Sequence, residues 1–403
     1  MQVGAVLPRF LLVYAALYAG YGLTTPFLPA LLSERGLSAT EVGLVLAAAT
    51  GIRLAAGPLA GRVADRLAAG RGVLAACAAL SAGSALLYLA GHGFSGLMLA
   101  GLAHAAATAP LAPLADALAL TAAAAKTAAA KTAAEPFRFA YGTVRGAGSA
   151  AFIAGTLAAG QVTGSLGLAA LPVAGAIAFA ALAGATLRLP DAASPAEAPS
   201  VGRGSAGAGL LLRSATFRRL VAVAALVIGS HAVHDAFAVI RWRAAGLTPS
   251  TASLLWAEAV AAEVLVFFLL GPPLLARLGP AGALGLAAGA GALRWSVAAL
   301  TVALPALVGI QALHGLTFAL LHLAAMRILS QTVPPALAAT AQTVYGTLGL
   351  GLATALATLA AGPLYGALGA GAFWVMTGLC GAALLLVPGL RDRATAVSDD
   401  RKD

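Results

Sequence analysis

The residues of this sequence best suited to chemistry are ionisable side chains that interrupt long apolar stretches. An ionised side chain at the centre of a membrane helix costs at least about 2.5 kcal/mol, so such a residue normally faces a partner or a water-filled cavity. Contact with a polar solute and passage of a proton are the two chemistries that this placement favours. The residues concerned are Arg53, His104, Asp116, Arg145, His231, His234, Asp235, Glu258, Glu263, Arg294, His314 and His322.

Asp116 and Arg145 are the first candidate pair, because they are expected at similar depth on neighbouring helices. Arg145 lies about seven residues, or roughly 10 Å, inside its apolar stretch. A carboxylate and a guanidinium can form a bidentate pair, and either could leave its partner to hold a polar or anionic solute. A purely structural ion pair is the alternative. Tyr14, Tyr18 and Tyr21 recur at helical spacing nearby in the first apolar stretch and could stack on an aromatic solute or serve only for packing.

A second group of residues suits proton transfer. A lone carboxylate such as Glu263 in apolar surroundings has a raised pKa, and a nearby guanidinium such as Arg294 favours release of its proton. His314 and His322 are eight residues apart, about 80° around a helix, and can share a broad face with Phe318. Histidine titrates near pH 6.5. We therefore predict that Glu263, Arg294, His314 and His322 couple proton movement, the alternative being histidines that only hydrogen-bond within the structure.

A metal site is not predicted. His231, His234 and Asp235 share a helix face through their spacing of three and four residues, but no fourth ligand is evident. Glu258, nearer the outer end of its stretch, is expected to be wetted or structural. The two cysteines lie inside apolar stretches with no C-x-x-C or Cys/His metal spacing.

The elements that must position these side chains are membrane helices. The chain has 403 residues, of which 61% are hydrophobic and 9% charged, and its mean hydropathy is +0.93, unlike a soluble globular domain. A span needs roughly 20 mostly apolar residues. The first stretch has no charged n-region or cleavage site and is expected to be a retained helix. We predict an all-α integral membrane protein with twelve spans, near residues 10–32, 41–60, 73–89, 95–122, 139–160, 166–187, 220–240, 251–274, 281–304, 306–329, 338–362 and 370–387.

Two six-helix halves are predicted, over residues 1–188 and 216–390, with a cytoplasmic linker at 189–215 and a cytoplasmic tail at 391–403. The linker is rich in Pro, Ser, Gly and Ala. Residues 35–38 (RGLS) match residues 245–248 (AGLT), and Gly57-Pro58 matches Gly271-Pro272. Such internal duplication is typical of transporters that bind their solute near mid-membrane between repeats. The Ala/Lys-rich segment 121–134 is expected to extend the fourth span as a helix.

The distribution of positive charge predicts the topology. Eighteen of the 24 Lys and Arg fall in segments that face the cytoplasm if the amino terminus is cytoplasmic. Three, Arg35, Arg241 and Arg243, fall on the opposite side, and the remaining three, Arg53, Arg145 and Arg294, lie within spans. Because positive residues collect on the cytoplasmic side, we expect both termini there, in a bacterial-type inner membrane. The net charge of +10 and pI near 10.3 therefore reflect topology, and no nucleic-acid partner is predicted.

The loop after the second predicted span carries a short motif. It reads Gly61, three residues, then Asp65-Arg66. This resembles the G-x-x-x-D-R loop of the major facilitator superfamily, in which the glycine allows close helix approach and the Asp and Arg help to latch one conformation. An ordinary basic loop is the alternative. The second Gly-Arg pair, at 70–71, comes later than in the usual pattern, so only Gly61, Asp65 and Arg66 are assigned to the latch.

A narrower resemblance is distributed over nearly the whole chain. Segments 113–120 (PLADALAL), 141–149 (YGTVRGAGS), 262–267 (AEVLVF), 294–295 (RW) and 311–326 (QALHGLTFALLHLAAM) resemble the phenylpropionate permease branch, a relative of the lactose permease type. That resemblance implies a carboxylate and an arginine at the solute site on spans four and five, and coupling groups on spans eight, nine and ten. The usual span-ten carboxylate has no counterpart, since Thr317 or Phe318 stands there.

These observations together predict a secondary active transporter that works by alternating access and not an enzyme. Proton-coupled symport of a small organic solute, with an aromatic carboxylate first, is expected from a monomer in the lipid bilayer, with the proton gradient as energy source and no cofactor. Sugar or nucleoside symport and drug efflux stay open; an integral-membrane enzyme or receptor is disfavoured because no nucleophile motif or phosphate loop is found. The residues assigned to solute binding are Asp116, Arg145, Tyr18, Tyr21, Gln311 and Phe318.

Overall fold

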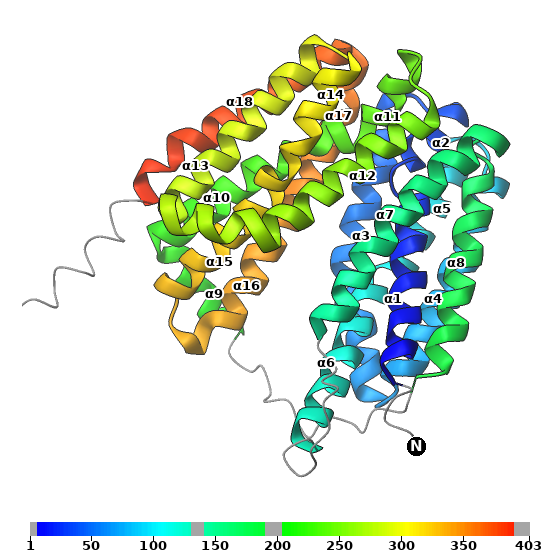
Figure 1. Cartoon of the computed structure of the whole chain (residues 1–403), viewed down its shortest axis with the longest axis horizontal. Coiled ribbons are helices and arrows are strands. Elements are labelled where there is room, and N and C mark those ends of the chain that lie inside the picture. The colour runs from blue at the N-terminus through cyan, green and yellow to red at the C-terminus, as the bar shows by residue number, and fades with distance from the viewer. Residues whose placement is uncertain (1–5, 130–140, 190–203, 391–403) are drawn as a thin grey trace, which may run out of the picture. The chain divides into compact units, whose positions relative to one another are not determined.

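The computed structural model describes residues 6–129, 141–189 and 204–390, and helices are the only regular secondary structure in those ranges (Figure 1). The chain divides into two compact units. The first holds residues 1–37, 48–200 and 246–257, and the second holds residues 38–47, 201–245 and 258–403. Each unit therefore takes in a short piece of helix from the other half of the sequence.

The helices of the first unit coincide with the first six predicted spans. They are α1 (Val6–Thr24), α2 (Leu28–Glu34), most of α3 (Ala39–Arg66), α4 (Gly70–Ala90), α5 (Gly93–Thr108), α6 (Leu111–Ala129), α7 (Tyr141–Leu166) and α8 (Ala170–Leu187). The predicted extension of the fourth span is helical as far as Ala129, and residues 130–134 lie outside the described residues.

The helices of the second unit coincide with the last six predicted spans. Its helices are α9 (Gly204–Arg213), α10 (Ala215–Gly229), α11 (Ala232–Ala244), the end of α12 (Pro249–Leu265), α13 (Gly271–Leu300), α14 (Leu304–Ala312), α15 (Leu321–Thr332), α16 (Ala338–Val344), α17 (Ala353–Leu368) and α18 (Ala372–Leu386). Three π-helical segments, η2 (Val266–Leu270), η3 (Leu316–Leu320) and η5 (Tyr345–Leu352), join consecutive helices. Residues 190–203 of the predicted linker and the predicted tail, 391–403, lie outside the described residues.

The helices are long and apolar enough for a multi-pass membrane protein. In the described part of the chain, nine helical stretches meet this standard by length and hydropathy, and two of them, Pro249–Leu300 and Pro335–Leu386, have 52 residues each, enough to cross twice. Within α13 the backbone turns at Gly279, where φ is 65°, and Pro280 follows. This turn separates the predicted eighth and ninth spans, so the arrangement is consistent with twelve spans.

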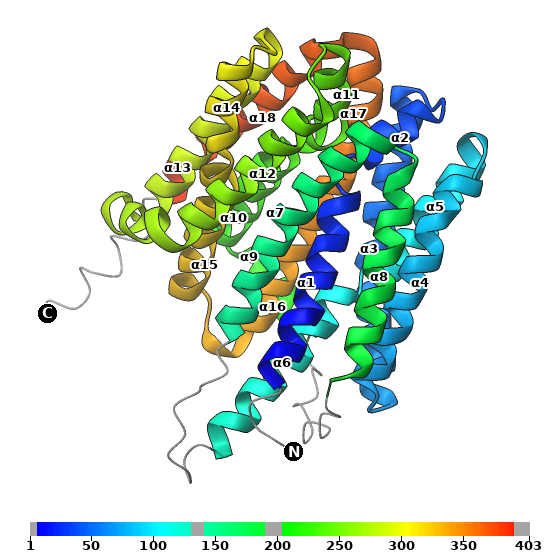
Figure 2. The ribbon, with the colours of Figure 1, turned by 45° about the vertical axis from the view of Figure 1, so that its right-hand side comes forward.

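Glycines let α1 and α7 approach closely in the first unit, where the two helices lie side by side (Figure 2). A Cβ on Gly22 would collide with the carbonyl oxygen of Phe152, and a Cβ on Gly155 would collide with the backbone of Ala19. Only glycine fits at these two points, as in other small-residue interfaces of membrane helices. This packing fixes the tyrosines of α1 beside α7, which carries Arg145.

Candidate functional site

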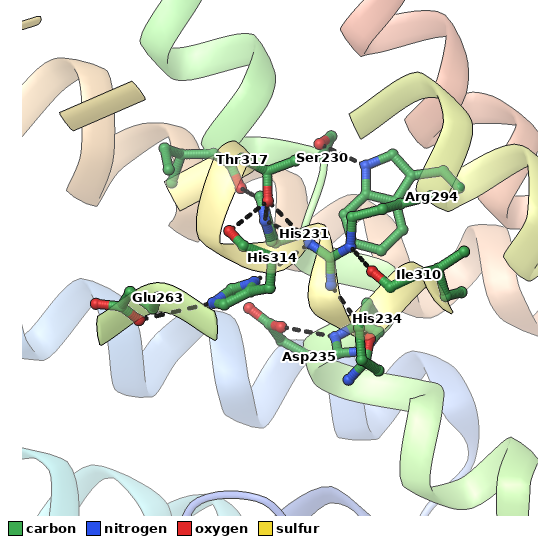
Figure 3. A network of polar contacts seen from close by, with 12 residues as sticks. Ser230, His231, His234, Asp235, Glu263, Arg294, Ile310, His314 and Thr317 are labelled. Carbon is green, nitrogen blue, oxygen red and sulfur yellow. Dashed lines mark hydrogen bonds and ion pairs between the residues drawn. The ribbon is translucent and has the colours of Figure 1, made fainter. Parts of the chain in front are cut away.

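Arg294, on α13, is the centre of a polar cluster inside the second unit (Figure 3). Its side chain is fully buried, with 0% of its surface exposed. Nε donates to the carbonyl oxygen of Ile310 at 2.9 Å, Nη2 to Gln311 Oε1 at 3.2 Å, and Nη1 to Thr317 Oγ1 at 2.9 Å. Three points of attachment fix the plane of the guanidinium.

Two histidines also face Nη1 of Arg294. His231 Nε2 and His314 Nδ1 each lie 3.2 Å from it, and the two imidazole centroids are 5.5 Å apart. His231 lies in the break between α10 and α11, and its Nδ1 is 3.0 Å from the carbonyl oxygen of Val227. The helix is interrupted at His231, so the carbonyl oxygen of Val227 is available to the His231 imidazole. The imidazole is thereby held in the core beside Arg294.

Carboxylates lie at the margin of this cluster and not on the guanidinium. Glu263 Oε2 is 3.8 Å from His314 Nε2, and Asp235 Oδ1 is 3.1 Å from His234 Nδ1 (Figure 3). Both carboxylate side chains are partly open, 33% exposed for Glu263 and 55% for Asp235. Among the described residues, no carboxylate forms an ion pair with Arg294. The buried cation is therefore surrounded by neutral acceptors.

A buried tryptophan and serine close the cluster on its inner side. The guanidinium carbon of Arg294 lies 4.5 Å from the ring centroid of Trp295, a cation–π contact. Trp295 Nε1 donates to Ser230 Oγ at 2.8 Å, and the Cys380 thiol donates to the same oxygen at 3.2 Å. These contacts hold the indole against the guanidinium.

A local widening of the helix after α14 brings His314 and Thr317 to the same guanidinium. Thr317 lies in the π-helical segment η3, and His314 lies just before it. Gly315 packs against the carbonyl oxygen of Ala262, so a side chain there would collide with backbone. π-Helical turns occur frequently at functional sites. This one contains Thr317, whose hydroxyl accepts a hydrogen bond from Arg294.

The first unit carries a different polar group, built on the tyrosines of α1. The Tyr14 hydroxyl donates to Asp116 Oδ1 at 2.5 Å, and the Arg145 guanidinium carbon lies 4.8 Å from the ring centroid of Tyr18. The rings of Tyr14 and Tyr18 are stacked, with centroids 5.9 Å apart. Both rings are buried, whereas Asp116 is partly buried and Arg145 is exposed.

The direct pair predicted between Asp116 and Arg145 is not formed in this conformation. The described residues contain no ion pair between them; each charged group instead contacts one ring of the stacked Tyr14 and Tyr18. In the described structure the Tyr14 hydroxyl holds the carboxylate. The two charges are therefore separately held and both reach the surface of the unit.

Comparisons with known proteins agree with this architecture. A model of the MFS_1 like family matches residues 7–376. A probable 3-phenylpropionic acid transporter of Escherichia coli (strain K12) is 33% identical over 382 residues, which cover 93% of this chain and 95% of that protein. The chain belongs to the major facilitator superfamily.

Other members of the superfamily match along almost their whole length. The maltose permease of Geobacillus stearothermophilus is 26% identical over 388 residues, 95% of each chain. The crystal structure of the nucleoside transporter NupG superposes with a TM-score of 0.82 at 16% identity, covering 96% of this chain and 98% of that one. A D-xylose-proton symporter superposes with a TM-score of 0.65 at 15% identity. The chain is thus a multi-pass transporter of small molecules and not an enzyme.

The remaining predicted residues of this major facilitator protein lie outside the two groups or at their edges. Tyr21 donates its hydroxyl to the carbonyl oxygen of Thr108 at 2.8 Å. Phe318 stacks on the imidazole of His314, with centroids 5.7 Å apart, and is 41% exposed. His322 lies 6.5 Å from the ring of Phe267 and has no contact with Arg294 in the described structure. The assignment of His322 to proton coupling stays a prediction.

The three residues of the predicted latch lie at the end of α3. Asp65 and Arg66 are exposed, and a Cβ on Gly61 would have nothing within 4 Å among the described atoms. No ion pair between Asp65 and Arg66 is found in the described part of this transporter. The latch assignment stays a prediction.

Several residues of the Arg294 cluster were absent from the sequence prediction. His231 was named among the ionisable residues of the apolar stretches but assigned to neither solute binding nor proton coupling, and Ser230, Trp295 and Thr317 were given no role. In the described residues no group of His, Cys, Asp and Glu could hold a metal ion. The available signal was the occurrence of Ser, Thr and His near the middle of apolar spans, where each polar group needs a partner.

Proposed function

We propose that this transporter carries out proton-coupled symport of a small organic anion, with an aromatic carboxylate such as 3-phenylpropionate as the first candidate. The observation that carries the proposal is the burial of Arg294 among neutral acceptors. A buried charge is costly unless it is paired, because hydrogen bonds to neutral groups replace only part of its lost hydration. A carboxylate delivered by the solute would supply the missing negative charge, in a bidentate geometry that guanidinium favours.

The His314–Glu263 contact supports the proton part of the proposal. A histidine 3.8 Å from a partly open carboxylate can accept a proton and keep it beside a negative charge. His314 in turn lies 3.2 Å, through Nδ1, from Nη1 of the guanidinium that we assign to the anion. Proton and solute would therefore act on the same buried cluster.

The tyrosine group of the first unit is a second set of residues that we assign to the solute. We assign Asp116, Arg145, Tyr18 and Tyr21 to solute binding, with Gln311 and Phe318 from the second unit. The stacked rings of Tyr14 and Tyr18 are a rigid, buried aromatic pair beside the exposed Arg145. The sequence similarity to a probable 3-phenylpropionic acid transporter favours the same solute class. From the distribution of Lys and Arg we also propose an inner-membrane location with both termini in the cytoplasm.

The proposal is tested with purified protein in liposomes that contain a pH-sensitive dye. Addition of 3-phenylpropionate outside should acidify the interior faster than in protein-free liposomes, which measure passive entry of the acid. The neutral analogue 3-phenyl-1-propanol should cause no acidification. Acidification by maltose or uridine in place of 3-phenylpropionate would contradict the anion assignment, and uptake of radiolabelled 3-phenylpropionate without proton movement would contradict the coupling.

A further inference from the structure

We propose that the first unit carries a second binding site, in which a cavity between α3, α4 and α5 takes the apolar body of a small organic anion and Arg53 takes its carboxylate. This site is separate from the Arg294 cluster, because all residues of the cavity wall belong to the first unit and Arg294 belongs to the second. Only the choice of an aromatic acid as the ligand rests on the proposed function.

The cavity has a volume of about 500 Å³ and a wall made mostly of small apolar groups. Six alanines from the three helices and Gly83 of α4 form most of this wall, and Pro110 follows at the end of α5. Pockets for small molecules have volumes of roughly 300 to 1,000 Å³ and are mainly apolar, with a few polar groups that orient the ligand. The size and the wall therefore suit a small apolar ligand.

The mouth of the cavity lies among exposed leucines of a membrane helix. Leu80 and Leu87 of α4 both line the cavity, and they are 64% and 42% exposed. Residues 70–90, which form α4, are long and apolar enough to span a membrane. Exposed leucines on such a helix face lipid tails, which are as apolar as they are. A ligand with an apolar body can therefore enter the cavity from the bilayer.

Arg53 lies on the face of α3 that lines the cavity. It precedes the lining residues Ala56 and Ala60 by three and seven positions, so the three side chains share one face of the helix. Its side chain is exposed, and its charge is within electrostatic reach of Tyr88 and His104. In residues 6–129, 141–189 and 204–390, Arg53 has no hydrogen bond or ion pair, so its five N–H donors are open to a ligand.

Ser84 supplies a polar group on the cavity wall beside that charge. Its Oγ lies 3.2 Å from His104 Nδ1 and 3.2 Å from the carbonyl oxygen of Ser81. The buried imidazole of His104 is held in turn by the rings of Tyr88 and Phe179, with centroids 5.8 and 5.7 Å away. These contacts fix the serine hydroxyl at one place on a wall that is otherwise mainly apolar.

The position of the charge favours an organic anion over a membrane lipid as the occupant. An ionised guanidinium within a membrane span is costly unless it meets a partner, and a carboxylate can pair with it through two oxygens. Arg53 lies midway along α3. The charged head group of a lipid stays outside the hydrocarbon core and does not reach that depth. A compact carboxylate with an apolar body satisfies both the cavity and the arginine.

The test uses 4-benzoylbenzoate, an aromatic carboxylate whose ketone bonds covalently to nearby C–H groups under ultraviolet light. The full-length protein in nanodiscs is irradiated with this probe, and mass spectrometry locates the labelled residues. We expect labels on the cavity wall of α3, α4 and α5, reduced by excess 3-phenylpropionate. Benzophenone, the same body without a carboxylate, measures entry of an apolar molecule alone.

Two variants separate the charge from the cavity. Arg53→Gln should lower cavity labelling by 4-benzoylbenzoate about tenfold, as loss of a charge-assisted hydrogen bond would give, and leave labelling by benzophenone unchanged. Arg62→Gln, at an exposed arginine of the same helix, is the matched control and should label like the wild type. Gly83→Leu puts a bulky side chain into the cavity, where a new Cβ has no atom within 4 Å, and should reduce labelling by both probes. Gly72→Leu, exposed on the same helix and outside the cavity wall, should not.

The inference is overturned by equal cavity labelling with 4-benzoylbenzoate in Arg53→Gln and the wild type, or by labelling that 3-phenylpropionate does not reduce. Labels spread over exposed helix surfaces and absent from the cavity wall would also overturn it, since they indicate adventitious contact from the bilayer. Transport in liposomes is measured on the same preparations. Transport of 3-phenylpropionate without cavity labelling overturns this inference alone, and cavity labelling that depends on Arg53 without transport overturns the proposed function alone.

Discussion

The two units of this transporter hold an arginine in opposite ways. Arg145 of the first unit is exposed and rests on the ring of Tyr18, while the nearby carboxylate, Asp116, is bound by Tyr14. Arg294 of the second unit is fully buried and surrounded by neutral acceptors, with the carboxylates beyond the histidines. An arginine is thus exposed against a tyrosine ring in the first unit and fully buried in the second.

Because the two side chains are of the same type and differ in burial, we expect burial to decide which arginine responds to a nearby proton. A change of one charge beside an exposed guanidinium is screened by water, whereas beside a buried one it is felt almost fully. Changes in the second unit should therefore alter coupling, and changes in the first unit should alter only affinity. Substitutions in the two units should therefore differ in size and in kind.

The largest effect is expected from Arg294→Lys. An ammonium is a single donor atom and cannot reach Ile310, Gln311 and Thr317 together, nor pair with a carboxylate through two atoms. Transport of 3-phenylpropionate into proteoliposomes should fall at least about 100-fold. Arg219→Lys, at an exposed arginine that donates to the Gly389 carbonyl oxygen, is the control and should stay near the wild-type rate. Similar transport rates in the two variants would contradict the assignment of Arg294 to solute binding.

An intermediate effect is expected from Gly148→Ala in the first unit. A Cβ at this position would lie 2.7 Å from Cδ2 of Tyr18, so the ring must shift away from its place under Arg145. KM for 3-phenylpropionate should rise about tenfold with little change in the proton-to-solute ratio, as a loss of about 1.4 kcal/mol of binding would give. Gly146→Ala, on the same helix with nothing within 4 Å of the new Cβ, should leave KM unchanged. An equal rise of KM in both variants would show a general helix effect.

A smaller effect is expected from Tyr14→Phe. This change removes the hydrogen bond to Asp116 and keeps the stacked ring, and water can replace the donor because the carboxylate is only partly buried. The apparent affinity should fall about threefold. Tyr345→Phe is the matched control, since the buried Tyr345 hydroxyl has no hydrogen-bond partner in the described structure, and it should not affect transport. A loss of proton coupling in Tyr14→Phe would contradict the assignment of the tyrosine group to solute binding alone.

The sequence was sufficient to predict the fold and the helices that carry the charged residues. Ionisable groups in apolar spans, together with the bias of Lys and Arg, indicate a membrane transporter before any coordinates are considered. The proximity of Glu263, Arg294 and His314 also follows from their depth on consecutive spans, and the structure brings these three together.

The directions in which the side chains point from their helices could not be predicted in the same way. The π-helical segment after His314 directs Thr317 to Arg294 and leaves His322 beside Phe267, which a regular period of 3.6 residues does not anticipate. The turn at residues 230–231, between α10 and α11, directs Ser230 toward Trp295 and His231 toward Arg294. In the first unit, Asp116 and Arg145 were correctly placed on neighbouring helices, but the competition from Tyr14 depends on a hydroxyl position that spacing alone does not fix.

The contrast between the two units is tested most directly by the number of protons taken up per molecule of 3-phenylpropionate, measured together in proteoliposomes of Asp116→Asn and Glu263→Gln. The account predicts a slower flux with an unchanged ratio for Asp116→Asn, and for Glu263→Gln a ratio reduced toward zero while downhill solute flux continues. An unchanged ratio in Glu263→Gln, or a ratio lost in Asp116→Asn, would contradict it.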